Sequence, residues 1–133
     1  MKKLVINANI LFSLVNEASV TSQIVRKIKT ELHSPCFALV EIKKYEAMLK
    51  VKMQISDFES CKKRLEKRII FRKEEEYQKE MQEIIKSIPD KKDVEYLALA
   101  LKEKVPLWSN DKELKKQSYV MVLSTREILE LIR

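Results

Sequence analysis

Four polar side chains in this sequence, Asn7, Glu41, Asp93 and Asp111, follow short apolar segments or stand in the first turn of an expected helix. Three of them are carboxylates, and like charges gathered in one place repel one another unless a cation lies between them. Hard oxygen ligands in that number suit Mg²⁺ or Mn²⁺. Such an ion can hold a phosphodiester, lower the pKa of a bound water and stabilise the leaving oxygen. If the fold brings these side chains together, they predict metal-dependent chemistry on a phosphodiester.

Each of these side chains also has a purely structural explanation. An acid at the N-cap or in the first turn of a helix stabilises that helix, and this applies to Asp90, Asp93 and Asp111. Glu41 is equally explained as a surface acid, and Asn7 as a residue that bonds its own turn. Both explanations stay open for every one of these residues when it is taken singly.

The composition excludes several other kinds of site. The chain of 133 residues has no glycine, so neither a GxGxxG dinucleotide turn nor a GxxxxGK[ST] phosphate loop can form. It has one histidine, His33, and two cysteines, Cys36 and Cys61, which together do not complete a zinc ligand set. Catalysis, if there is any, is expected to depend on carboxylates.

The longest uncharged stretch, residues 4–16, is shorter than the roughly 20 residues that a membrane helix requires. It starts like a signal peptide, but Asn7 and Asn9 interrupt its apolar run and no A-x-A cleavage site follows. Two cysteines in a chain of this size make no disulfide framework. We therefore expect a cytoplasmic protein with free thiols and no membrane partner.

The net charge of +7 is concentrated in one segment. Residues 42–73 hold 11 Lys and Arg against 4 Asp and Glu, and the remainder of the chain is neutral. Such a segment attracts a polyanion such as RNA, although a solvated helix face is the simpler interpretation. The candidate RNA-binding residues are Lys43, Lys44, Lys62, Lys63, Arg64, Lys67 and Arg68.

The apolar patterning predicts strands alternating with helices. Strands are expected at residues 4–6, 36–38, 69–71, 106–109 and 119–123. Helices are expected at residues 8–15, 20–32, 39–53, 57–68, 74–85, 90–105 and 111–116, with a closing helix after a cap at Ser124 or Thr125. This order predicts one α/β domain over residues 1–133, a three-layer α/β/α arrangement with a central, mostly parallel twisted sheet. The basic segment 42–73 is expected to be helical.

This architecture gives the polar residues a common place. Sites in open α/β sheets form outside the carboxyl ends of the strands. Asn7, Glu41, Asp93 and Asp111 all follow strands or begin the helices next to that edge, so they are expected to meet there.

Four segments of the chain resemble the PIN-domain family of nucleases. Residues 4–11 (LVINANIL) resemble the opening strand of the family, and residues 37–45 (FALVEIKKY) the segment that carries its glutamate. Residues 89–100 (PDKKDVEYLALA) and 107–112 (LWSNDK) resemble its third and fourth acidic motifs. The last two, in this order and at this spacing, are the most specific.

The resemblance implies an endoribonuclease that uses Mg²⁺ or Mn²⁺ and leaves 5′-phosphate and 3′-hydroxyl ends. Its catalytic and metal-binding set would be Asn7, Glu41, Asp93 and Asp111, with Asp90 as either an accessory ligand or only a helix cap. Many small members are toxins of toxin–antitoxin pairs, so an antitoxin-like protein is a partner option besides RNA. Exposed apolar helix faces leave a homodimer open as well.

Asn7 departs from the family pattern, which has an aspartate at that position. The amide oxygen can still accept a hydrogen bond or ligate, but it brings no negative charge, and the NH₂ group repels a cation. Weaker metal binding and slower chemistry are expected. The substitution has three explanations: a change made to disable a harmful nuclease, a naturally weakened enzyme, or a catalytically silent PIN-like module that binds RNA or protein.

Overall fold

A computed structural model describes residues 1–132 and shows a five-stranded sheet in which every pair of neighbouring strands is parallel. The strand order is β3-β2-β1-β4-β5. The strands are β1 (Lys3–Ile6), β2 (Glu31–Pro35), β3 (Ile69–Arg72), β4 (Leu107–Trp108) and β5 (Val122–Leu123). The predicted parallel sheet is confirmed.

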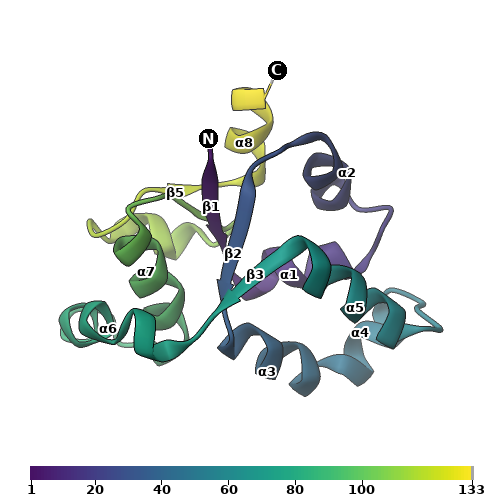
Figure 1. Ribbon diagram of the computed structural model, residues 1–133, viewed down its shortest axis with the longest axis horizontal. Helices are drawn as coiled ribbons and strands as arrows, with labels where there is room; N and C mark the ends of the chain where they lie inside the picture. Colours follow the sequence, from purple (N-terminus) through teal and green to yellow (C-terminus); the bar gives the residue numbers. More distant parts are fainter. Residues whose placement is uncertain (133) are drawn as a thin grey trace.

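Helices cover both faces of this sheet (Figure 1). On one side α7 (Lys91–Glu103) packs against β1, β2 and β4, with α6 (Gln78–Ile84) packed on α7. On the other side lie α1 (Ala8–Val15), α2 (Val20–Lys27), α3 (Phe37–Lys44), α4 (Glu46–Lys52) and α5 (Phe58–Arg68). The predicted three-layer α/β/α arrangement is therefore confirmed.

The central strand is buried on both faces. Leu4, Val5 and Ile6 have no exposed surface, because α7 covers one side of β1 and the helices of the opposite layer cover the other. A run of apolar residues without alternation is typical of such a strand. Trp108 on the neighbouring strand is also fully buried, and its Nε1 donates to Thr125 Oγ1 at 3.1 Å, so this ring is part of the core.

The helix predicted over residues 20–32 is wrong at its C-terminal end. The strand predicted over residues 36–38 is wrong altogether, because the strand lies at residues 31–35 and these residues begin α3. α2 ends at Lys27, and Leu32 lies in β2, where it pairs with Leu4 on one side and Ile69 on the other. Two neighbouring strands thus override a helical period that the sequence shows locally. Pro35 ends β2, and Cys36 is already the N-cap of α3.

Other boundaries differ more modestly. The helix predicted over residues 39–53 is divided at Tyr45 into α3 and α4, and the segment 74–85 begins with the 3₁₀ helix η1 (Glu74–Glu76) before α6. The basic segment 42–73 is not helical throughout, because its last residues form β3. The helix predicted at residues 111–116 is the 3₁₀ helix η2 (Lys112–Lys116), and the strands predicted at residues 106–109 and 119–123 are shorter.

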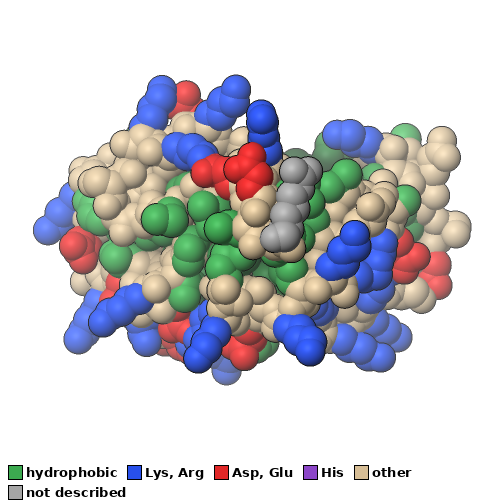
Figure 2. Space-filling view, turned by 90° about the horizontal axis from the view of Figure 1, so that it is seen from above, with side chains coloured by type: hydrophobic (Ala, Val, Ile, Leu, Met, Phe, Trp, Pro, Cys, Tyr) green, Lys and Arg blue, Asp and Glu red, His purple; other side chains and the backbone are tan. Residues whose placement is uncertain are grey.

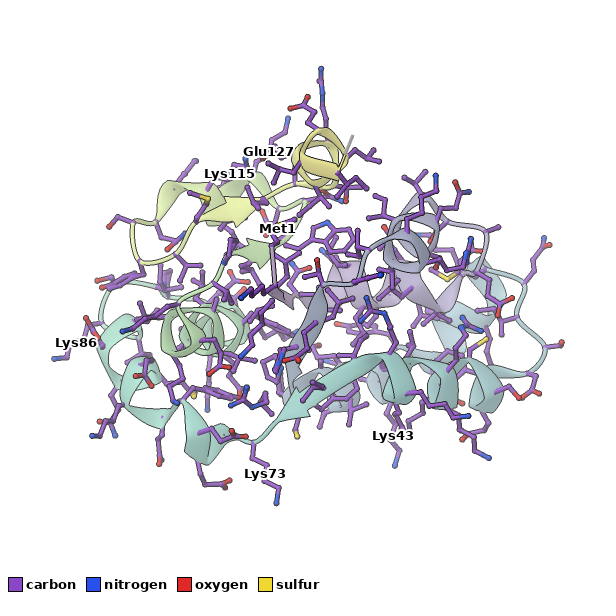
Figure 3. All side chains as sticks on the ribbon, turned by 45° about the horizontal axis from the view of Figure 1, so that its top comes forward. Met1, Lys43, Lys73, Lys86, Lys115 and Glu127 are labelled. Carbon is purple, nitrogen blue, oxygen red and sulfur yellow. The ribbon has the colours of Figure 1, made fainter. Side chains whose placement is uncertain are left out.

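The closing helix, α8 (Thr125–Ile132), is capped as predicted at Ser124. Its Oγ accepts from the Glu127 backbone N–H at 3.2 Å, and the Glu127 carboxylate also pairs with Lys115 (Figure 3). α8 and the start of β1 lie at the same end of the molecule, away from the carboxyl ends of the strands (Figure 1). In the part of the chain that the structure describes, no helix has the length and apolar character needed to cross a membrane.

Candidate active site

The strand order reverses between β1 and β4, which is where an open α/β sheet forms its crevice. A cavity of about 530 Å³ lies beside the carboxyl ends of these strands. Its wall includes all five residues that the sequence proposed as catalytic or metal-binding, namely Asn7, Glu41, Asp90, Asp93 and Asp111. The fold thus brings together side chains that follow β1 and β4, Glu41 from the second turn of α3, and two acids from the N-terminal end of α7.

Asn7 is buried and uses both ends of its amide inside the protein. Its Oδ1 accepts from the Ile10 backbone N–H at 3.2 Å, which makes Asn7 the N-cap of α1. Its Nδ2 donates to Ser109 Oγ at 2.7 Å. The amide therefore ties the end of β1 to the end of β4 while adding no charge to the cavity.

Ser109 holds a second wall residue in place. Its Oγ, fully buried, also accepts from the Asp111 backbone N–H at 3.1 Å. Asp111 in turn caps η2, since its Oδ1 accepts from the Glu113 N–H at 3.0 Å. The cap uses one carboxylate oxygen, which leaves Oδ2 for a ligand. Ser109 is not one of the predicted site residues, although its position at the end of an expected strand was a usable signal.

The first turn of α7 carries two acids with different roles. Asp90 is the N-cap, and its Oδ1 accepts from the Lys92 N–H at 2.9 Å. Asp93 is half-buried, and its pKa is raised from 3.8 to about 6, first by burial and then by the negative charges of Asp90 and Asp111. The repulsion between carboxylates that the sequence predicted is therefore present at Asp93.

Glu41 reaches the cavity from α3, which starts immediately after β2 ends. This residue is 5% exposed, and the nearest cation is Lys92, whose Nζ lies 4.0 Å from Glu41 Oε2. The Glu41 side chain lines the cavity, so a cation bound there would be attracted to its carboxylate.

Tyr96 lies three residues after Asp93 and lines the same cavity. Its Oη is the one buried side-chain polar atom in residues 1–132 that has no hydrogen-bond partner. Burial raises the pKa of Tyr96, and the negative charge of Glu41 raises it further, so the phenol stays protonated at neutral pH. Residues three apart on a helix share a face, so Tyr96 lies on the face of α7 that carries Asp93. Tyr96 was therefore predictable as a residue of the site, although it was not predicted.

The carboxylate and amide oxygens of this cavity are ligands that suit Mg²⁺ or Mn²⁺, but they do not form a complete coordination shell. Within residues 1–132, no group of three or more Asp, Glu, His or Cys side chains is placed to hold a metal ion together. Mg²⁺ is usually held by one or two carboxylates, several waters and the phosphates of the substrate, rather than by a complete protein cage. Carboxylates spread around one cavity meet that requirement.

The candidate RNA-binding residues lie outside this cavity. Lys43 and Lys44 end α3 and are exposed, and Lys43 points away from the body of the molecule (Figure 3). The basic side chains that do line the cavity are Lys52 and Lys92, which the sequence analysis did not select. On the face shown in Figure 2, Lys and Arg are spread around the rim among Asp and Glu and do not form one patch.

The arginines and lysines of α5 differ in their surroundings. Arg64 Nη2 donates to the Leu14 carbonyl at 3.2 Å, and Arg68 Nη2 donates to the Thr30 carbonyl at 2.9 Å. Both arginines therefore stabilise the ends of neighbouring segments. Lys63 and Lys67, on the same helix, are exposed and remain available to a polyanion.

The surroundings of His33 do not support a zinc site. His33 is buried in β2, with Nε2 at 2.6 Å from Glu31 Oε1 and Nδ1 at 3.1 Å from Arg72 Nη1. Both ring nitrogens are thus engaged within the protein.

Comparisons with known proteins agree with this fold. The family model described as PIN domain matches residues 5–132. The fold is similar to that of a chain in the crystal structure of VapBC2 from Rickettsia felis, which is bound to a DNA fragment from its promoter: the TM-score is 0.66, at 16% identity over 92% of this chain and 98% of that one. Among curated proteins, none matches. The chain belongs to the PIN-domain family, a family of nucleases.

Proposed function

We propose that this protein is an endoribonuclease that hydrolyses RNA phosphodiester bonds with the help of Mg²⁺ or Mn²⁺. One observation carries the proposal: Glu41, Asp93, Asp111 and the amide of Asn7 share one cavity at the crevice of the sheet. Membership of a nuclease family supports the reaction class.

Asp93 and Asp111 would hold the metal ion, and Glu41 and Asp90, which line the same cavity, would bind it through water. When bound, the ion would lower the pKa of a water and neutralise charge on the phosphate. The raised pKa of Asp93, whose main cause is burial, indicates a carboxylate that a bound cation would stabilise.

The chain's own residues then have separable tasks. The ammonium groups of Lys52 and Lys92 would bind phosphate oxygens of the RNA. One of the carboxylates that line the cavity would accept a proton from the attacking water, while the oxygen of that water forms a bond to phosphorus. The bond between phosphorus and the 3′-oxygen breaks, and that oxygen takes up a proton, which leaves 5′-phosphate and 3′-hydroxyl ends.

Asn7 would weaken this site without deforming it. The amide keeps the α1 cap and the Ser109 bond, so the wall retains its shape, but the cavity lacks one negative charge. The expected consequence is weaker metal binding and slower cleavage.

A protein partner is a second part of the proposal. The likeness in fold to a chain of VapBC2 supports an antitoxin-like partner for this chain. A homodimer is compatible with the exposed apolar side chains Val40, Met48 and Val51 on α3 and α4.

The competing function is a PIN-like module that binds RNA or protein without cleaving, and Asn7 is the observation that favours it. Metal titration separates the two functions. A nuclease site is expected to take up Mn²⁺ and to gain thermal stability from it, whereas a binding module has no need of the ion.

The proposal is tested by acid-to-amide substitutions on the Asn7→Asp background. Glu41→Gln and Asp93→Asn are each expected to abolish Mn²⁺-dependent RNA cleavage while circular dichroism shows a folded protein. Glu83→Gln, an exposed acid on α6, serves as the matched control and should cleave like its parent. Unchanged cleavage in either site variant would remove that residue from the mechanism.

A further inference from the structure

The cavity that holds the carboxylates has a second, apolar part. Phe12, Tyr45, Met48, Leu49 and Met53 also line it. We propose that this part is a subsite for one unstacked nucleobase of the RNA, next to the phosphate that is cleaved. The inference rests on the proposed ribonuclease function and assigns a further binding subsite to the same cavity.

The order of residues along two helices makes the acidic and apolar parts continuous. On α1, the cavity wall runs from Asn7 at the cap to Phe12 more than one turn later. On α3 and α4 it runs from Glu41 through Tyr45 to Lys52. A ligand whose phosphate lies at the acids is therefore next to the apolar wall, and Lys52, which lines the same cavity, would bind a neighbouring phosphate.

Tyr45 is placed by the break between α3 and α4. Its backbone, at φ −102° and ψ 12°, ends one helix and begins the next, so the side chain is part of the wall at the junction. The ring packs edge-on against Phe12, with centroids 5.7 Å apart and planes at 67°, and it stays half-exposed. Lys44 Nζ lies 5.4 Å from the centre of the Tyr45 ring.

This wall has the chemistry of a base-binding surface. A base can stack on an aromatic ring whatever its identity. Methionine is a soft, adaptable contact, and Met48, which lines the same wall, is 50% exposed. The Tyr45 ring and the Met48 thioether thus stay open to solvent in the same cavity as the carboxylates.

The geometry also selects the state of the RNA. Bases in a duplex are stacked and paired, so none is free to enter a cavity beside the backbone, whereas single strands, loops and bulges present unstacked bases. Single-stranded RNA should therefore bind more tightly than the same sequence in a duplex. The competing occupant of this wall is an apolar side chain of a partner protein, and that case predicts no effect on RNA.

The test measures RNA binding by fluorescence anisotropy in Ca²⁺, with a short single-stranded RNA of mixed sequence and the same RNA annealed to its complement. Tyr45→Leu keeps apolar contact with Phe12 but removes the stacking face. It is expected to weaken single-strand binding roughly five- to 150-fold, the range for losing one base–aromatic stack. Tyr45→Phe, which keeps the ring, is expected to restore binding relative to Tyr45→Leu.

A second pair of variants avoids any question of folding. Met48→Glu changes an exposed position of the wall and should weaken RNA binding, because it adds a charge that repels the backbone. Met121→Glu changes an equally apolar, 67% exposed position that does not line this cavity, and it should bind RNA like the parent. An RNA carrying 2-aminopurine should show fluorescence quenching with Tyr45→Phe and less with Tyr45→Leu.

The outcomes separate the subsite from the proposed function. If the Asn7→Asp chain cleaves RNA but Tyr45→Leu and Met48→Glu bind single-stranded RNA like their parent, the subsite is refuted and the nuclease stands. Equal binding of duplex and single strand would also refute the subsite. If no RNA is cleaved while Tyr45→Leu loses binding, the nucleobase subsite stands and the cleavage proposal fails.

Discussion

Asn7 Nδ2 donates a hydrogen bond of 2.7 Å to Ser109 Oγ, and this bond joins the ends of β1 and β4 across the crevice of the sheet. A serine hydroxyl can accept from an amide or donate to a carboxylate by rotating its hydrogen. An aspartate at position 7 would therefore keep the same contact with the direction of donation reversed. The position tolerates amide or acid structurally, and the difference between them is the charge in the cavity.

Ser109→Ala is expected to lower the free energy of unfolding by about 1–3 kcal/mol, because it leaves both Asn7 Nδ2 and the Asp111 N–H without their acceptor. Ser34→Ala is the matched control: Ser34 is equally buried but makes one hydrogen bond, to the Ile6 carbonyl at 3.0 Å. Urea denaturation measures both. A smaller loss in Ser109→Ala than in Ser34→Ala would contradict the bridging role.

Tyr96→Phe is expected to raise stability, by about 1 kcal/mol, because it removes a buried hydroxyl that has no partner and keeps the ring in place beside Phe37. Differential scanning calorimetry without metal gives the change. Tyr77→Phe should have the opposite sign, since its hydroxyl donates to Glu95 Oε1 at 2.9 Å. If Tyr96→Phe destabilises the protein as much as Tyr77→Phe does, the Tyr96 hydroxyl has a partner after all.

Asp93 makes stability depend on pH. Its pKa in the folded protein is about 6, raised mainly by burial from an ordinary value of 3.8. The folded state therefore holds this proton more tightly than the unfolded state, so the contribution of Asp93 to stability falls as pH rises from about 4 to 6. Asp93→Asn should raise the free energy of unfolding by about 1–2 kcal/mol at pH 7 and change it little at pH 3.5.

Denaturation curves of the Asp93→Asn variant and its parent at the two pH values test this prediction. The same variant should gain less thermal stability from Mn²⁺ than its parent does. A variant that is equally destabilised at both pH values would show that Asp93 makes a favourable contact, not an unfavourable charge.

The basic residues of α5 should divide into two groups. Lys63→Gln with Lys67→Gln should weaken RNA binding and reduce its salt slope by about 1–1.5, since each lost phosphate contact on a single strand removes about 0.7. Arg64→Gln should instead lower stability, because Arg64 bonds the Leu14 and Val15 carbonyls at the end of α1. RNA titrations at several salt concentrations and thermal melts distinguish these effects. If the salt dependence of RNA binding is the same in the double lysine variant and its parent, then Lys63 and Lys67 only form a solvated helix face.

Much of this fold was predictable from local patterns. The uninterrupted apolar run at residues 4–6 and the helical period of residues 90–105 each identified an element that the structure contains. β2 was not predictable in this way. Leu32 continues the apolar spacing of the preceding helix, and only its pairing with Leu4 of β1 and Ile69 of β3, distant in sequence, makes it part of a strand.

The candidate site and its surroundings were also predictable only in part. Asn7, Asp93 and Asp111 stand next to recognisable strand ends or helix caps, so their place at one sheet edge followed from the topology. The inward turn of Arg64 did not follow from the sequence, because a basic side chain on a charged helix is usually solvated. The unpartnered hydroxyl of Tyr96 depends on packing that no spacing shows.

The most direct test of the central claim compares RNA cleavage by this chain and by its Asn7→Asp variant in Mn²⁺, with and without EDTA. Restoring the negative charge at position 7 should speed cleavage at least roughly tenfold, as expected when a group that tunes a metal site is restored. EDTA should abolish cleavage in both proteins. If the variant cleaves no RNA, or if its cleavage persists in EDTA, this cavity is not the metal-dependent nuclease site proposed for it.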